Sequence, residues 1–250
     1  MRNVVVACLM FLASLSAAME PPFKMGNIAY PAAGNIELDE GTLEMWLISG
    51  FDASDTNAYR NCILFDLIYP EDNLHYCILN FSGATLGEAG WAPVRHSAVM
   101  FRIPTWKPGQ LHCLTWTWSG RMRSMFVDGR YDESKPSEGP LQGEGRGYTS
   151  LDVPVEGPLL GNLSRGFLWI GRNTSMITVD EIRISSVART PEEIKANWQK
   201  APTRDAYTLL LDHCDGGAAE VITGVPGAKL EGACKVVDGR FGKAIQLWVE

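Results

Sequence analysis

The feature that most constrains this chain is a series of short runs in which apolar and polar residues alternate. In residues 42–48 every second side chain is leucine or methionine, the pattern of a strand with one face in a core. Runs of this kind recur at the spacing typical of a β-sandwich rather than of alternating strands and helices. The sequence therefore predicts an all-β sandwich of two antiparallel sheets, with strands at 42–48, 62–68, 75–80, 98–103, 111–118, 123–127, 166–171 and 177–185.

Local signals predict one tight turn and one helix. Asp128-Gly129 lies between two strand-like runs, and this dipeptide is typical of a hairpin turn. Thr190 has a hydroxyl that can cap a helix, Pro191 suits the first turn, and Glu193 completes the capping-box spacing. We expect a short surface helix that closes the domain, followed by a polar linker at residues 201–206.

Residues 1–18 have the pattern of a secretory signal. Arg2 is the basic start, residues 4–15 are apolar, and residues 16–18 (Ser-Ala-Ala) are small at the cleavage position. The apolar run is shorter than the roughly 20 residues that span a bilayer, and no second stretch of the sequence reaches that length. We expect an exported protein, secreted or extracytoplasmic, without a membrane span.

The charge of the chain argues against nucleic acid as a partner. The formal net charge is −7 at pH 7, whereas proteins that bind nucleic acid present clustered lysine and arginine to the phosphates. No such cluster occurs in the sequence.

The cysteines leave two interpretations open. Cys62 and Cys77 flank a predicted hairpin, Cys214 and Cys234 lie near the C-terminus, and Cys113 lies between these pairs. Export permits disulfides, but buried thiols that pack as small apolar groups are an equal alternative. No Cys/His spacing suits zinc.

Several stretches carry a family resemblance in their order along the chain. They are residues 41–46 (GTLEMW), 114–118 (LTWTW), 125–129 (MFVDG), 179–184 (VDEIRI) and 189–194 (RTPEEI). In this order they resemble the opening strand, the central hairpin and the closing signature of laminin-G-like domains, which belong to the concanavalin A-like lectin/glucanase jelly rolls. The resemblance implies a jelly-roll β-sandwich over residues 19–200, with the short helix at its C-terminal end.

The end of the chain has further motifs of this family. Residues 209–216 (LLLDHCDG) and 239–245 (GRFGKAI) resemble entry strands, which in the family precede the opening strand. We expect residues 201–250 to be a linker and the start of a truncated second laminin-G-like domain. The alternative is that these strands fold back and complete the first domain.

The resemblance also implies a calcium site. Members of this fold often hold a structural calcium through acidic loop residues, and calcium takes six to eight oxygen ligands. Asp180 is the best-placed candidate, and Asp215 joins it if the tail folds back. The alternative is that each carboxylate accepts backbone hydrogen bonds at a strand end. No other cofactor is expected.

Exposed aromatic side chains are the candidates for carbohydrate binding, because such sandwiches stack them on sugar faces. Trp91 and Trp106 lie in loops that contain glycine or proline, and we assign them as candidate ligand-binding residues, with core packing as the alternative for Trp106. The tryptophans in predicted strands are expected mostly in the core: Trp46, Trp116, Trp118 and Trp169.

No residue is assigned a catalytic role. Glu37, Asp39 and Glu40 are the nearest imitation of the paired carboxylates of polysaccharide-cleaving enzymes, but they fall in a predicted turn. We therefore expect an exported non-catalytic module that binds a glycan or a protein ligand at the cell surface. The alternatives are a structural accessory domain of a larger exported assembly and a polysaccharide-cleaving enzyme of the same fold.

Overall fold

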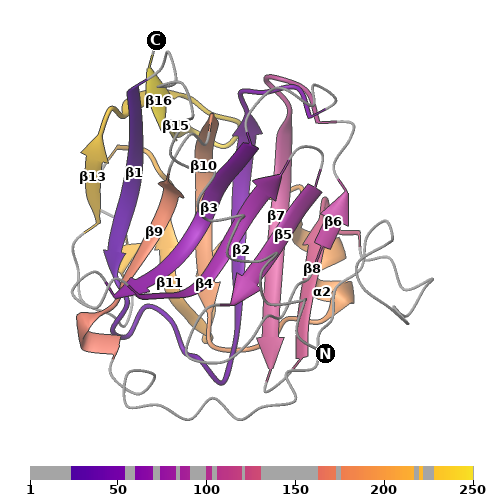
Figure 1. Ribbon diagram of the computed structural model, residues 1–250. Helices are drawn as coiled ribbons and strands as arrows, with labels where there is room; N and C mark the ends of the chain where they lie inside the picture. The colour runs from indigo at the N-terminus through magenta and orange to yellow at the C-terminus, as the bar shows by residue number, and fades with distance from the viewer. Residues whose placement is uncertain are drawn as a thin grey trace, which may run out of the picture.

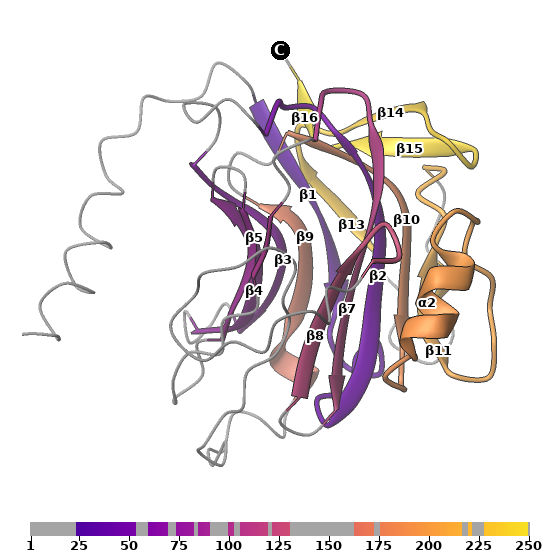
Figure 2. The same cartoon turned by 90° about the vertical axis from the view of Figure 1, so that its right-hand side faces the viewer.

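The computed structural model describes residues 24–53, 60–69, 74–82, 85–90, 100–102, 106–119, 122–130, 163–172, 176–216, 220–221 and 228–249. These residues form two antiparallel sheets packed face to face, with one short α-helix on the outside (Figures 1 and 2). The predicted all-β sandwich is therefore confirmed. The predicted signal at residues 1–18 lies outside the described residues, as does Trp91.

The first sheet faces the viewer in Figure 1. Its strands run in the order β13-β1-β9-β3-β4-β5-β6, and β16 also pairs with β1. The strands are β1 (Lys24–Pro31), β3 (Arg60–Tyr69), β4 (Leu74–Ser82), β5 (Thr85–Gly90), β6 (Met100–Arg102), β9 (Phe167–Arg172), β13 (Lys229–Gly232) and β16 (Trp248–Val249).

The second sheet lies behind the first. Its strands run in the order β12-β11-β10-β2-β7-β8, and β15 pairs with both β10 and β14. The strands are β2 (Glu40–Ser49), β7 (Leu111–Ser119), β8 (Met122–Val127), β10 (Ile177–Ser185), β11 (Thr208–Asp212), β12 (Glu220–Val221), β14 (Lys235–Asp238) and β15 (Lys243–Gln246). A short 3-10 turn, η3 (Leu163–Arg165), precedes β9.

The core lies between the two sheets and follows the alternation of the sequence. Leu43, Met45 and Leu47 of β2 belong to it, because successive side chains of a strand point to opposite faces. Glu44 and Trp46 therefore point to the outer face of the second sheet, where both are nevertheless buried. The helix α2 (Pro191–Asn197) lies over this outer face (Figure 2).

The predicted turn and helix start form as expected. Asp128 and Gly129 both have positive φ, at 53° and 69°, as a hairpin turn of this type requires. Thr190 Oγ1 accepts a hydrogen bond from the N–H of Glu193, and the Glu193 carboxylate accepts one from the N–H of Thr190, which makes a capping box. No helix in the described part of the chain is long and apolar enough to cross a membrane.

The tail of the chain adds strands to both sheets. In the second sheet, β11 and β15 pair with β10; in the first sheet, β13 and β16 pair with β1. The described strands of the tail therefore pair within the same two sheets, the pairing that the fold-back alternative requires. Cys214 and Cys234 are both free thiols, as is Cys113.

Candidate ligand-binding surface and cation site

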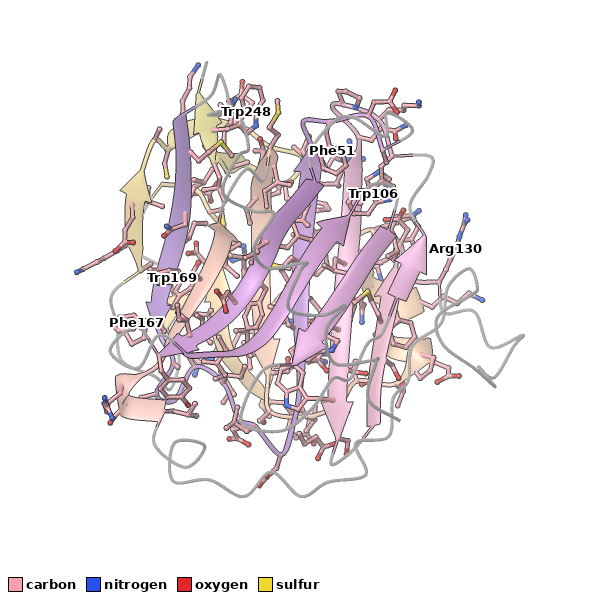
Figure 3. All side chains as sticks on the ribbon, in the orientation of Figure 1. Phe51, Trp106, Arg130, Phe167, Trp169 and Trp248 are labelled. Atoms are coloured by element: carbon pink, nitrogen blue, oxygen red, sulfur yellow. The ribbon has the colours of Figure 1, made fainter. Side chains whose placement is uncertain are left out.

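Two aromatic side chains of β9 lie on the outer face of the first sheet. Leu168 and Ile170 are buried in the core between the sheets, so the residues that alternate with them, Phe167 and Trp169, point outward. Phe167 is 38% exposed, and Trp169 is half-buried. Figure 3 labels both along β9. Phe167 and Trp169 form the β9 aromatic pair.

The neighbours of this pair are mixed in size and polarity. The strand registers place Trp169 opposite Ala29 of β1 and Asp66 of β3, and Phe167 opposite Pro31 of β1 and Ile68 of β3. Ala29, Asp66 and Ile68 are all buried, whereas Phe167 is exposed and Trp169 is half-buried.

The first sheet presents this surface on a concave side. In Figure 2 its strands are curved, with the convex side of the sheet towards the second sheet and the concave side outward. Ligand sites are generally concave and combine aromatic side chains with a small number of polar groups. The β9 aromatic pair lies on the face of the sandwich that has this shape.

Trp106, one of the two tryptophans predicted to bind a ligand, is a core residue. It is 2% exposed, and its ring stacks on the imidazole of His112 with 4.1 Å between centroids and 1° between planes. Its carbonyl accepts a hydrogen bond from the N–H of Ala53. The ring closes one end of the core and cannot stack on a sugar. Figure 3 labels it together with Phe51.

Trp169 is the residue that the sequence prediction missed. Its position in a strand placed it among the expected core tryptophans, and Trp46, Trp116 and Trp118 are indeed buried. The signal that could have found Trp169 is its alternation with Leu168, which points it away from the core.

The structure brings the two predicted metal ligands to the same turn of the tail. Asp180 Oδ2 accepts hydrogen bonds from the N–H groups of Arg240, at 2.8 Å, and Phe241, at 3.3 Å. Asp215 Oδ1 accepts one from the N–H of Lys243, at 2.6 Å. The carboxylates of β10 and of the segment after β11 therefore both hold residues 239–243.

The turn leaves no room for side chains beside these carboxylates. A Cβ atom on Gly239 would lie 2.3 Å from Asp180 Oδ1, and one on Gly242 would lie 2.7 Å from Asp215 Oδ1. Glycine is therefore needed at both positions for the backbone to approach the acids.

The electrostatics of this end of the sandwich favour a positive charge. Burial raises the pKa of Asp180, and the nearby charge of Asp215 raises it further, while the N–H groups of Arg240 and Phe241 oppose the shift. Burial raises the pKa of Glu181 to about 7, although His213 opposes the shift with Nδ1 at 2.6 Å from Glu181 Oε2. Desolvated carboxylates that repel each other are stabilised by a cation.

Asp180 provides the observation that tests whether a cation fits. It is completely buried, and its Oδ1 atom has no hydrogen-bond partner, although buried carboxylate oxygens are nearly always satisfied. No group of three or more His, Cys, Asp or Glu side chains with metal-binding geometry occurs among the described residues. Calcium would thus take side-chain oxygens from Asp180 and Asp215 and its remaining ligands from carbonyls and water.

The three acids that come nearest to the paired carboxylates of a glycosidase lie on the surface, two just before β2 and one at its first residue. Glu37, Asp39 and Glu40 are all exposed. The backbone carbonyl of Glu37 accepts a hydrogen bond from Trp118 Nε1, and Glu40 Oε1 accepts one from the N–H of Ala188. Glycosidases place their two carboxylates on either side of the scissile bond, whereas these acids follow one another along a single segment.

Comparison with known proteins supports the fold. No family model matches the sequence, and no curated protein matches it. Among solved structures, a protein from Bacteroides ovatus ATCC 8483, named as a candidate carbohydrate binding protein, superposes with a TM-score of 0.51 at 14% sequence identity. The match covers 83% of this chain and 59% of that protein. The chain therefore spans less than two thirds of the length of this relative.

Two further groups of structures resemble the chain more weakly. The receptor binding domain of botulinum neurotoxin mosaic serotype C/D matches with a TM-score of 0.49 and 13% identity, over 70% of this chain and 41% of that one. A Trypanosoma rangeli sialidase mutant matches with a TM-score of 0.39 and 15% identity, over 62% and 22%. What the chain shares with the Bacteroides ovatus protein is its β-sandwich fold.

Proposed function

We propose that this chain is an exported, non-catalytic module of the laminin-G-like type that binds carbohydrate at the cell surface. The observation that carries the proposal is the β9 aromatic pair, because it offers apolar ring surface on the concave side of the sandwich. Sugar rings have apolar faces that pack on such surfaces, and tryptophan contributes a large contact area. The name of the Bacteroides ovatus protein supports the same class of ligand.

Two other parts of the proposal rest on the sequence. Export rests on the signal predicted at residues 1–18, and membership of the laminin-G-like family rests on the ordered motifs between residues 41 and 198. Trp91, in a loop of the sequence after β5, is a second candidate for contact with the ligand.

The proposal is tested by measuring binding to a panel of polysaccharides. Phe167→Ala and Trp169→Ala should each weaken binding by about tenfold or more, since removing a central aromatic contact typically costs over 1.4 kcal/mol. Tyr207→Ala is the matched control, because Tyr207 is 53% exposed but precedes β11 of the other sheet. The affinity of the Tyr207→Ala variant for the polysaccharide should equal that of the parent protein.

Other outcomes would point to other functions. If both β9 variants bound like the parent protein and Trp91→Ala lost binding, the binding site would be assigned to Trp91. An absence of binding across the panel would favour a structural accessory domain. Release of reducing ends from any polysaccharide, abolished by Glu37→Gln or Asp39→Asn, would favour an enzyme.

We also propose that a calcium ion binds at Asp180 and Asp215. The support is the buried Oδ1 atom of Asp180, which has no hydrogen-bond partner, together with the second carboxylate on the same turn. The ion would neutralise both charges and hold residues 239–243 against β10. The proposed role of the ion is structural.

A further inference from the structure

The first sheet ends at β13, on the left in Figure 1. Among the described strands, none pairs with the outer edge of β13, and all its residues are exposed. An edge of this kind presents unpaired N–H and C=O groups that can accept a further strand.

An apolar side chain lies at the middle of this edge. Leu230 is 47% exposed, although it is opposite Ile28 of β1, which is fully buried in the core. Opposite residues of a pair of strands point to the same face. Leu230 therefore points to the core-facing side of the first sheet, but at this edge of the sheet its side chain is exposed.

The charges beside Leu230 are complementary to those of a reversed copy of the same strand. Lys229 and Glu231 flank Leu230 and point to the opposite face. A second β13 strand, antiparallel and centred on Leu230, would lie with Leu230 opposite Leu230 of the partner subunit. Lys229 would then be opposite Glu231 of the partner subunit, and Glu231 opposite Lys229 of the partner subunit.

We propose that this protein forms a homodimer in which the first sheets of two copies join edge to edge through β13. The contact is isologous, because the same residues contribute on both sides of a two-fold axis. Each opposite-charge pair across two strands is stabilising, and like charges at the same positions are destabilising. The charge of Lys229 disfavours pairing of this edge with unrelated strands. A reversed copy of β13 is different, because it places Glu231 of the partner subunit opposite this lysine.

The dimer would place both candidate ligand surfaces on one side. A two-fold axis through Leu230 is perpendicular to the joined sheet, so the outer faces of the two first sheets point the same way. The two β9 aromatic pairs would then face one surface and could bind a repetitive glycan with increased avidity. This consequence rests on the proposed function, but the dimer itself does not.

The test is the mass of the full chain in solution, measured by analytical ultracentrifugation over a range of concentrations. The parent protein should be a dimer. Lys229→Glu and Glu231→Lys should each weaken dimerisation by about tenfold or more, because both charge pairs become repulsive. An equimolar mixture of these two variants should dimerise again, since the charges are complementary between the two chains.

Two further variants keep the test decisive. The double variant Lys229→Glu with Glu231→Lys restores both pairs within one chain and should dimerise like the parent. Leu230→Glu places two carboxylates on the axis and should be monomeric, with an unchanged circular dichroism spectrum. A parent protein that is monomeric throughout would overturn the proposal, and so would a dimer whose stability does not respond to these charges. Carbohydrate binding, measured separately, should persist in the monomeric variants at the level of single sites.

Discussion

At the scale of single residues, a buried ion pair lies on the outer face of the second sheet. Glu44 of β2 accepts hydrogen bonds from Arg183 Nη2 at 2.8 Å and from Arg183 Nε at 2.5 Å, and both side chains are almost fully buried. Arg183 Nη1 also donates to the carbonyl of Thr203, at 3.1 Å. Burial lowers the pKa of Arg183, but the Glu44 carboxylate outweighs this effect, and the pKa is raised.

Glu44→Gln should destabilise the protein by about 3 kcal/mol, because it leaves the buried guanidinium without its counter-charge. The measurement is the free energy of unfolding from urea denaturation. The double replacement of Glu44→Leu with Arg183→Met is the control, since removing both charges together should recover most of the loss. A loss well below 1 kcal/mol in Glu44→Gln would mean that water reaches the pair.

At the scale of elements, the segment between β10 and β11 covers the outer face of the second sheet. It contains α2, and Trp46 Nε1 of β2 donates a hydrogen bond to the carbonyl of Trp198 just after this helix, at 2.7 Å. Before the helix, Arg189 Nη2 donates to Ser185 Oγ of β10 at 2.9 Å and to Asp205 Oδ2, near the end of the segment, at 2.5 Å. These contacts fix both ends of the covering segment to the sheet.

The Arg189–Asp205 contact makes part of this attachment dependent on pH. Burial alone would raise the pKa of Asp205, but hydrogen bonds from Arg189 and Thr208 outweigh it and lower the pKa. A lowered pKa in the folded state contributes stability above the unfolded value of about 3.9 and loses it as the pH falls through the folded value.

Asp205→Asn should therefore be less stable than the parent protein at pH 7, and the difference should shrink as the pH falls below about 4. The measurement is the urea midpoint of both proteins across this range of pH. Glu192→Gln, which removes an exposed acid in the first turn of α2, serves as the control for the loss of one charge. A difference that is constant with pH would assign Asp205 a role independent of its ionisation.

At the scale of the whole molecule, the tail connects the two sheets. Tyr30 of β1 donates a hydrogen bond through its hydroxyl to Asp212 Oδ2 of β11, at 2.6 Å across the core. Burial, with the neighbouring Asp212 charge, raises the pKa of this phenol well above its ordinary value, so it stays a donor. The turn at residues 239–243 lies between β14 and β15 of the second sheet and holds these strands to β10 and β11 through the carboxylates of Asp180 and Asp215.

Calcium at this turn should stabilise the entire sandwich. Free calcium at about 100 times its Kd should raise the melting temperature by about 5–10 °C, because binding to the folded state alone contributes roughly 2.7 kcal/mol. Asp180→Asn should abolish the calcium effect. Asp238→Asn, which changes an exposed acid of the same tail, should retain it. Equal melting temperatures with calcium and with a chelator would contradict the proposed ion.

Local patterns in the sequence were sufficient for the eight strands predicted between residues 42 and 185, the Asp128-Gly129 turn and the capping box at Thr190, because each depends on residues within a few positions of one another. They did not predict β1 or β5. The alternation also determines that Trp46 and Trp169 both point away from the core. Their different burial does not follow from it: Trp46 is fully buried on the face where α2 lies, whereas Trp169 of β9 is only half-buried.

The place of the tail likewise depended on contacts between distant parts of the chain. Residues 209–216 and 239–245 are strand-like by themselves, and their motifs favoured the start of a second domain, with completion of the first domain as the alternative. The deciding contacts join β11 and β15 to β10, and β13 and β16 to β1. The residues of a strand determine which of its side chains share a face. The backbone N–H and C=O groups can be satisfied by any neighbouring strand, whatever its sequence. The choice of neighbour is therefore made by the packing of the folded chain.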